Sequence, residues 1–381
     1  MQKLKLFSFI AVAVLGFTAC GDQQLTTSEN LAMLEQIVPD YVDNTIIPTY
    51  KALADNAIEL EKALVMLKNN RTDANVFTAC KEWVDSRKFW EQSEAFLFGA
   101  AADFGIDPHI DTWPLDLTAL VAELGNADHI AAMAAEDGAA WAGEKLGAGL
   151  LGFHGIEYIL FRNGQKRPFG DIRDNELIYA IAVAGDLRNQ CIRLEAAWAG
   201  KNNVSAEKQL IINNFELGVT IANGQSYGEN MKNAGKAGST YKSFTDAAED
   251  IIQGCTDISD EVAAMKIGKP YKGEDINYIE SPYSHNSITD FVDNVESIRN
   301  AYLGGVEGKR DNSLHGFFDK VNKNFDNRVL AAIDEAIDKI SAIQNFETNP
   351  ASAQAGIAIE ALNSLTSIFE EAQLELRKAV E

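Results

Sequence analysis

Residues 76–97 read VFTACKEWVDSRKFWEQSEAFL, and this stretch decides the fold class. Alternating steps of four and three from its first residue give a mostly apolar seam, which consists of Val76, Cys80, Trp83, Arg87, Trp90, Glu94 and Leu97. That period is typical of a helix that packs one face into a core. Two seam positions, Arg87 and Glu94, are charged, so we expect either an internal ion pair or a ligand within a helical core.

The same helical period recurs along the chain, and we find no convincing alternating strand pattern. Helices are expected over residues 28–68, 73–98, 138–162, 174–199, 205–233, 240–267, 287–303, 313–345 and 351–380. Pro39 and Pro48 should kink the first helix without ending it, because the apolar spacing continues across both. A polar turn at 200–204 divides the pattern. We therefore predict an all-α fold of two four-helix-bundle-like domains, an amino-terminal one over 28–200 and a carboxyl-terminal one over 204–381.

The amino terminus has the pattern of a secretory signal. Lys3 and Lys5 precede an apolar run over 6–17, and small residues lead to Cys20. The stretch before Cys20 resembles a bacterial lipobox, so we expect residues 1–19 to be cleaved, Cys20 to carry lipid and residues 20–27 to form a tether. The alternative is a plain signal peptide that contains a cysteine. The prediction is an exported bacterial lipoprotein that is membrane-anchored through Cys20, in the periplasm or at the cell surface.

Charge and cysteine content narrow the function classes. The formal net charge is -23, which argues against a nucleic-acid partner and is compatible with attracting cations. Cys80, Cys191 and Cys255 lie far apart and form no C-x-x-C motif, so a thiolate zinc site is not expected. We interpret them as small buried hydrophobic residues. The sequence does not say which of them could pair.

The segment Gly152-Phe153-His154-Gly155-Ile156-Glu157 places an imidazole and a carboxylate three residues apart in an apolar run. On a helix the two side chains lie on neighbouring turns of one face and can converge on one ion. A buried carboxylate is costly unless it is paired or coordinated. A structural hydrogen bond between His154 and Glu157 is the alternative.

Further carboxylates come from two other segments. Glu91 and Glu94 lie one turn apart near the end of the helix expected over 73–98, where Arg87 could simply pair with Glu94. The irregular stretch 105–114 adds Asp107 and Asp111, whose alternative role is to close turns before Pro108 and Pro114.

Together these motifs resemble the imelysin-like family of exported bacterial proteins. The resemblance covers nearly all of the chain beyond the signal segment. It rests on residues 90–99, on Ile110-Asp111-Thr112-Trp113-Pro114, on Gly152-x-His154-x-x-Glu157-Tyr158, and on residues 280–287 with Asp290. It implies two four-helix bundles with a site near their interface. Carried over, the metal ligands are His154, Glu157, Glu94 and Asp111, with Glu91 as a further candidate. We expect Arg87, Trp113, Glu280, Ser281 and Ser284 to line the site.

The ligand types favour a metal carrier over a peptidase. One histidine with several carboxylates suits a hard ion such as iron or manganese, whereas catalytic zinc sites use more nitrogen or sulfur. Iron is the expected ion, with zinc and calcium as alternatives, and the family resemblance adds a role in metal acquisition with iron-uptake components as partners. A metallopeptidase that uses the same residues is the second reading. A structural or ligand-binding lipoprotein without metal is the third.

Overall fold

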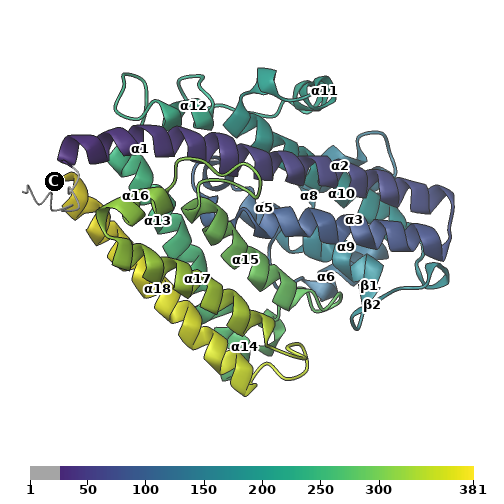
Figure 1. Cartoon of the computed structure of the whole chain (residues 1–381). Coiled ribbons are helices and arrows are strands. Elements are labelled where there is room, and N and C mark those ends of the chain that lie inside the picture. The colour runs from purple at the N-terminus through teal and green to yellow at the C-terminus, as the bar shows by residue number, and fades with distance from the viewer. Residues whose placement is uncertain (1–25) are drawn as a thin grey trace, which may run out of the picture.

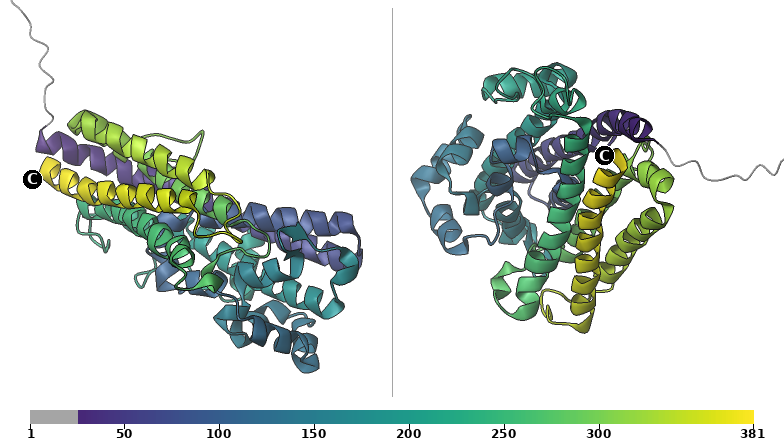
Figure 2. Two further views of the ribbon diagram at one scale, coloured as in Figure 1. Left: turned by 90° about the horizontal axis from the view of Figure 1, so that it is seen from below. Right: turned by 90° about the vertical axis from the view of Figure 1, so that its left-hand side faces the viewer.

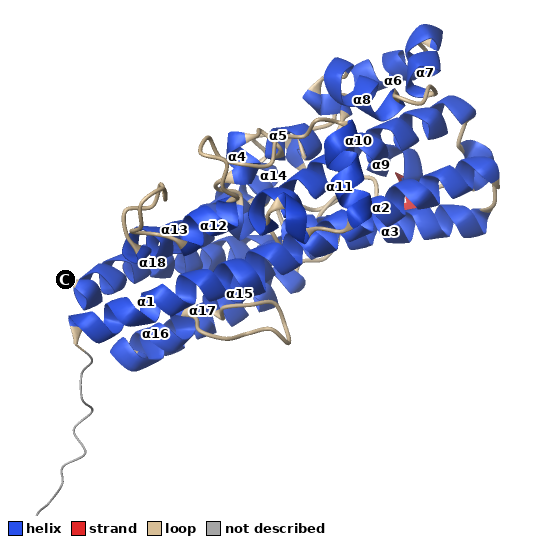
Figure 3. Ribbon diagram, turned by 90° about the horizontal axis from the view of Figure 1, so that it is seen from above, coloured by secondary structure: helices blue, strands red, loops and turns tan. Residues whose placement is uncertain are grey.

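The fold is all-α, as the sequence predicts. The computed structural model describes residues 26–381, and almost every described element is a helix (Figures 1 and 3). The expected cleavage site, the tether and Cys20 lie outside these residues. No described helix is both long and apolar enough to cross a membrane. Cys80, Cys191 and Cys255 are buried free thiols, which agrees with their interpretation as small buried residues.

One long helical segment opens the chain. α1 (Thr27–Tyr41) continues through a π-helical turn, Val42–Ile46, into α2 (Ile47–Asn69). Pro39 lies inside α1 and Pro48 lies in the first turn of α2. Pro48 has no N–H to donate to the Asn44 carbonyl one turn back, and that carbonyl accepts from Val306 instead. The helix expected over 28–68 is therefore continuous, and the π turn takes up the change in hydrogen-bond register between the two prolines.

The rest of the amino-terminal half is more broken than its sequence pattern. The helices are α3 (Asp73–Glu91), α4 (Ala100–Asp103), α5 (Asp107–Ile110), α6 (Leu117–Leu124), α7 (Ala127–Met133), α8 (Gly138–Lys145), α9 (Gly152–Leu160) and α10 (Asp174–Ala199), with 3₁₀ turns at Glu94–Phe96 (η2), Ala148–Leu150 and Phe169–Asp171. Two predictions were wrong here. The helix over 73–98 ends at Glu91, so Glu94 lies on the separate turn η2. The helix over 138–162 is split, and a short hairpin of β1 (Phe161–Arg162) and β2 (Gln165–Lys166) follows α9.

The carboxyl-terminal half is likewise built from helices. They are α11 (Ala206–Asn214), α12 (Tyr227–Lys232), α13 (Phe244–Glu261), α14 (Gly268–Lys272), α15 (Ser287–Tyr302), α16 (Leu314–Val321), α17 (Lys323–Ser341) and α18 (Ala353–Val380), with 3₁₀ turns at Lys201–Asn203 and Ile276–Tyr278 and a π turn at Val262–Lys266 (η6). The helix expected over 205–233 forms only at its two ends. The helix expected over 240–267 ends in the π turn η6, and the one over 313–345 is interrupted at Asn322.

Packing brings distant parts of the chain together. α2 packs against α3 and α10, with α8 and α9 on α10, while α13, α15, α17 and α18 form the other cluster of helices. α1 lies against α13 and α18 (Figure 2). Asn30 donates a hydrogen bond to the Ala379 carbonyl near the end of the chain. The first helical segment thus contacts both clusters. The division into domains over 28–200 and 204–381 stays a prediction.

Candidate metal centre

α3 supplies the cation at the centre of the site. Arg87 is fully buried, and one of its terminal nitrogens lies 2.5 Å from Glu91 Oε1, one turn along the same helix. The same nitrogen lies 2.6 Å from Glu280 Oε1, on the segment before α15. The guanidinium also pairs with Asp111, beyond the end of α5. A single buried arginine therefore gathers acids from three separate segments, and these acids provide the counter-charge that a buried guanidinium needs.

Asp111 connects α3 to the histidine. Trp90 Nε1 donates a 2.7 Å hydrogen bond to Asp111 Oδ2, and the Nε2 atom of His154 lies 3.1 Å from Asp111 Oδ1. Arg87 outweighs the effect of burial and holds the pKa of Asp111 below its usual range. Burial alone would lower the pKa of His154, but its contacts with the Asp111 and Glu157 carboxylates raise it to about 9.

A glycine is required where α9 begins. Gly152 has φ +69°, and a Cβ there would lie 1.7 Å from the carbonyl oxygen of Ile110. Only glycine permits this close approach between the start of α9 and the end of α5. It places His154 beside Asp111 and beneath the Trp113 ring, whose centroid lies 4.5 Å from that of the imidazole.

Glu157 lies on the other side of the imidazole from Asp111. Its Oε2 is 3.5 Å from His154 Nδ1. Its Oε1 accepts hydrogen bonds from the backbone N–H groups of Tyr283 and Ser284, at 3.0 and 2.7 Å, and from the Ser284 hydroxyl at 2.7 Å. A carboxylate bound in this way orients the ring, in the manner of the groups that support metal-ligating histidines.

The carboxyl-terminal half contributes a lysine and more acids. Lys266, on the π turn η6, is buried with its Nζ 3.4 Å from both Glu91 Oε2 and Glu280 Oε2. Asn294 donates a 2.5 Å hydrogen bond to Glu91, and Ser281 donates one of the same length to Asp290. Burial raises the pKa of Asp290 to about 7 and that of Glu91 well above its usual range.

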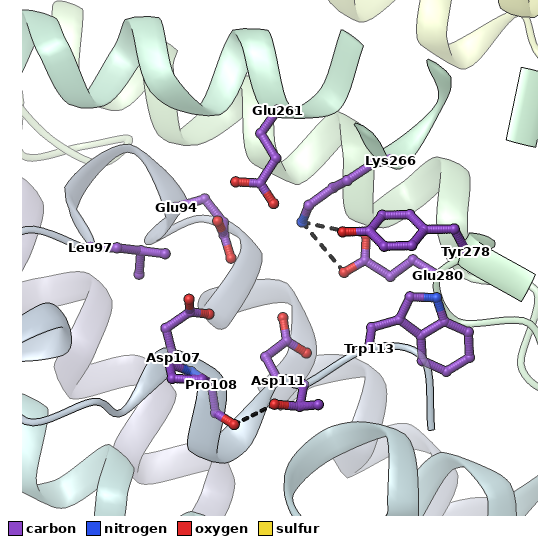
Figure 4. Close-up of a pocket in the computed structure, with 11 residues that line it drawn as sticks. Glu94, Leu97, Asp107, Pro108, Asp111, Trp113, Glu261, Lys266, Tyr278 and Glu280 are labelled. Carbon is purple, nitrogen blue, oxygen red and sulfur yellow. Dashed lines mark hydrogen bonds and ion pairs between the residues drawn. The ribbon is translucent and has the colours of Figure 1, made fainter. Parts of the chain in front are cut away.

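A cavity of about 230 Å³, here called the central cavity, opens beside this network. Its lining consists of Glu94, Leu97, Asp107, Pro108, Asp111, Thr112, Trp113, Glu261, Lys266, Tyr278 and Glu280. Figure 4 shows acids from opposite walls pointing toward one another, with Glu261 above and Asp107 and Asp111 below. Burial raises the pKa of Asp107 to about 7 and that of Glu94 well above its usual range. The carboxyl groups of the site far outnumber its two permanent cations, Arg87 and Lys266.

Two overlapping sets of ligand atoms could hold a cation. Atoms of Asp111, His154 and Glu280 lie within 4.8 Å of one another, and so do atoms of Glu91, Glu94 and Asp111. His154 Nε2 and Glu280 Oε2 are buried beside Asp111 and Lys266, at 3.1 and 3.4 Å, but neither atom makes a hydrogen bond of good geometry within residues 26–381. Buried polar atoms without such partners are costly, and a bound cation would satisfy both. The residues present therefore fit a metal ion.

The structure brings most of the predicted site residues to one place. His154, Asp111, Glu94, Glu91 and Glu280 lie at or beside the cavity, together with Arg87 and Trp113. Glu157, Ser281 and Ser284 lie behind them and hold His154 and Asp290. The alternative to a ligand role for Glu94, a pair with Arg87, does not form, because Arg87 pairs with Glu91, Asp111 and Glu280 instead.

Sequence reasoning missed Lys266 and Glu261. Their signal was present but weak. A lysine between Met265 and Ile267, in an apolar run, is an unusual choice for a buried helix and indicates a buried partner.

Comparison with known proteins now gives the family. The sequence profile of imelysin, named as a peptidase family, matches residues 46–371. The chain belongs to the imelysin family. It is 28% identical to iron-regulated protein A of Synechococcus elongatus over 288 residues, which cover 76% of this chain and 68% of that protein.

Solved structures of imelysin-like proteins share the fold. A crystal structure assigned as an iron-regulated protein A precursor, from Parabacteroides distasonis, superposes with a TM-score of 0.76 at 27% identity, and the match covers 91% of this chain and 95% of the other. An imelysin-like protein from Psychrobacter arcticum has a TM-score of 0.60 at 15% identity over 93% and 96% of the two chains. The latter similarity is evidence for the fold alone.

Proposed function

We propose that this imelysin-family protein is an exported, lipid-anchored metal-binding protein whose cargo is iron, held at the central cavity for metal acquisition. The observation that carries this proposal is the meeting of His154 with Asp111 and Glu280, three potential ligands from separate segments within 4.8 Å of one another. One imidazole nitrogen with carboxylate oxygens is a donor set suited to iron or manganese.

The ligand roles follow from the geometry. His154 would bind through Nε2, because Nδ1 faces Glu157. Asp111 and Glu280 would supply oxygens, and Asp111 is shared with the second set formed with Glu91 and Glu94. Glu157 would hold the imidazole in place and would not touch the ion.

The two basic side chains of the site are consistent with a carrier that releases its ion. Arg87 and Lys266 neutralise part of the acidic charge beside the ligands, and each contacts Glu280. A nearby positive charge weakens the attraction for a second cation. The site would therefore hold its ion reversibly, which is what delivery to iron-uptake components requires.

The similarity to iron-regulated proteins supports iron as the cargo, and the amino-terminal pattern supports export and anchoring. The anchor is tested by mass spectrometry of protein from membranes. Diacylated Cys20 as the first residue is expected, and Cys20→Ala should release the protein from the membrane. A first residue other than Cys20 would contradict the lipoprotein assignment.

Calorimetry tests the metal site. Purified protein is titrated with Mn²⁺, and with Fe²⁺ under anaerobic conditions, alongside Asp111→Asn, His154→Ala and His109→Ala. His109 is the matched control, because it pairs with the buried Asp186 and does not line the central cavity. Loss of a ligand should weaken binding at least about 100-fold, whereas the control should bind like the wild type. If the wild type bound neither ion, the cluster would be a network of structural ion pairs and not a metal site.

Peptide hydrolysis is the second candidate. Glu94 lines the same cavity as Asp111 and makes no hydrogen bond or ion pair in the described part of the chain, so it could act as a general base. The test is cleavage of an unfolded protein by the metal-loaded wild type and by Glu94→Gln. Metal-dependent cleavage that Glu94→Gln abolishes would favour a peptidase. Tight binding without cleavage would favour the carrier.

A further inference from the structure

A second cavity of about 260 Å³, here called the outer cavity, lies between α13 and the turn η2. Its lining consists of Glu94, Leu97, Phe98, Asp250, Gln253, Gly254, Asp257, Ile258 and Glu261. Three of these residues, Glu94, Leu97 and Glu261, also line the central cavity. The two cavities are therefore neighbours that share one wall.

The lining of the outer cavity is acidic without any basic counterpart. It has four carboxylates and no lysine, arginine or histidine. Asp250, Asp257 and Glu261 follow one stripe of α13, because they lie seven and eleven residues apart along the helix. All three are exposed, so this row runs along the surface of α13 as far as the shared wall, which Glu261 lines. Such a surface attracts cations and repels anions.

Gly254, in the middle of that stripe, allows the row to approach Glu94. A Cβ at this position would lie 2.0 Å from the carbonyl oxygen of Ala95, on the turn that carries Glu94. The backbone of α13 thus packs directly on η2, and the acids on either side of Gly254 lie beside it.

Glu94 itself is an unpartnered buried carboxylate. Its side chain is only 7% exposed, and it makes no hydrogen bond or ion pair with any residue in 26–381. Figure 4 shows it beside Leu97 with its carboxylate pointing into the central cavity, toward the acids of the opposite wall. A group this buried normally has a partner. Glu94 lies at the wall common to both cavities.

We propose that the outer cavity is the entry route for divalent cations and that Glu94 transfers the ion into the central cavity. This inference rests on the proposed metal-binding function. The exposed acids concentrate cations at the mouth, and Glu94 offers an oxygen ligand between the mouth and Asp111. A residue of this kind governs how fast the ion enters and leaves more than how tightly it is finally held.

Stopped-flow mixing with Mn²⁺ alone tests the route. The fluorescence of Trp90 and Trp113, which touch Asp111 and His154, reports arrival at the central cavity. Asp257→Asn is compared with Asp260→Asn, an exposed acid of α13 that lines neither cavity. Asp257→Asn should lower the association rate about three- to tenfold at low salt, and the difference should vanish at high salt. The control should match the wild type.

A variant that narrows the passage tests the entry route independently of charge. Leu97 is half-buried and lines both cavities, so Leu97→Trp should narrow the passage. It should slow association and dissociation by a similar factor and leave the equilibrium affinity within about twofold. Circular dichroism verifies that the variant folds.

The outcomes separate the two proposals. If the wild type binds Mn²⁺ but Asp257→Asn and Leu97→Trp keep its rates, the ion enters elsewhere and the entry route is wrong, although the metal site stands. If the wild type gives no Mn²⁺ signal, or if Asp111→Asn gives the same signal as the wild type, the metal-binding function itself is wrong.

Discussion

Glu157 accepts two hydrogen bonds from Ser284, one from its backbone N–H and one from its hydroxyl, each 2.7 Å long. The two residues are 127 positions apart in the chain. Because the other oxygen of Glu157 faces His154, a segment of the carboxyl-terminal half fixes the orientation of a ligand in the amino-terminal half.

Glu157→Gln should weaken Mn²⁺ binding by about 10- to 100-fold. The glutamine oxygen can still accept from Ser284, but its amide group places a donor where His154 Nδ1 needs an acceptor. Calorimetry measures the affinity. Ser284→Ala is the control, since it removes one hydrogen bond, should cost about 1 kcal/mol of unfolding free energy and should leave the affinity nearly unchanged. Equal affinities for Glu157→Gln and the wild type would contradict this role.

Arg87→Gln should lower the free energy of unfolding by about 3–5 kcal/mol, because buried carboxylates lose their counter-charge. Millimolar Mn²⁺ should then raise the thermal midpoint of the variant more than that of the wild type, since the ion replaces the missing charge. Thermal unfolding followed by circular dichroism measures both effects. Arg328→Gln, which breaks an exposed pair with Glu371, should cost less than about 1 kcal/mol. Equal metal effects on Arg87→Gln and the wild type would rule out this compensation.

Gly254→Ala should destabilise the fold by about 2–4 kcal/mol, since its methyl group would overlap the carbonyl of Ala95 and push α13 away from η2. Gly147→Ala is the matched control, because a Cβ there meets no atom within 4 Å. Urea unfolding of both variants measures the difference. Similar stabilities for the two variants would mean that α13 can move away from η2 at little cost.

Asp293→Asn should stabilise the protein at neutral pH. Burial raises the pKa of Asp293 to about 6, although Gln92 donates a hydrogen bond to it. An acid whose pKa is higher in the folded than in the unfolded state loses stability as pH rises between the two values, here from about 4 to about 6. The variant should gain about 3 kcal/mol at pH 7.5 and about 1 kcal/mol at pH 4.5. Urea unfolding at both pH values measures this. A gain independent of pH would show that the carboxylate is not the cause.

The apolar period was sufficient to predict the fold class and the regular helices. α10 and α15 match their expected ranges closely, because uninterrupted apolar spacing and clear ends define them. The period failed where the chain leaves the helix without a proline or a polar run. Glu94 keeps its place in the helical seam of the sequence, yet the backbone turns after Glu91 and directs it into a cavity.

The candidate site was predictable as a set of residues but not as a set of roles. Local spacing identified His154 and Glu157. It could not show that Ser284 would donate a hydrogen bond to one oxygen of Glu157. Nor could it show that Lys266 would reach Glu280, because that contact depends on a π turn and on how the two halves pack. Roles of this kind are fixed by tertiary contacts.

The helical segment formed by α1, the π turn and α2 is one continuous element that packs against both clusters of helices. At the π turn, Val306 donates a backbone hydrogen bond to the Asn44 carbonyl, so the middle of this segment is also bound to the carboxyl-terminal half. A hinged, clamshell-like closure of two lobes, as in many solute-binding proteins, would have to break this hydrogen bond. An ion would therefore enter and leave through small movements of side chains and short loops, while the two clusters of helices keep their relative positions.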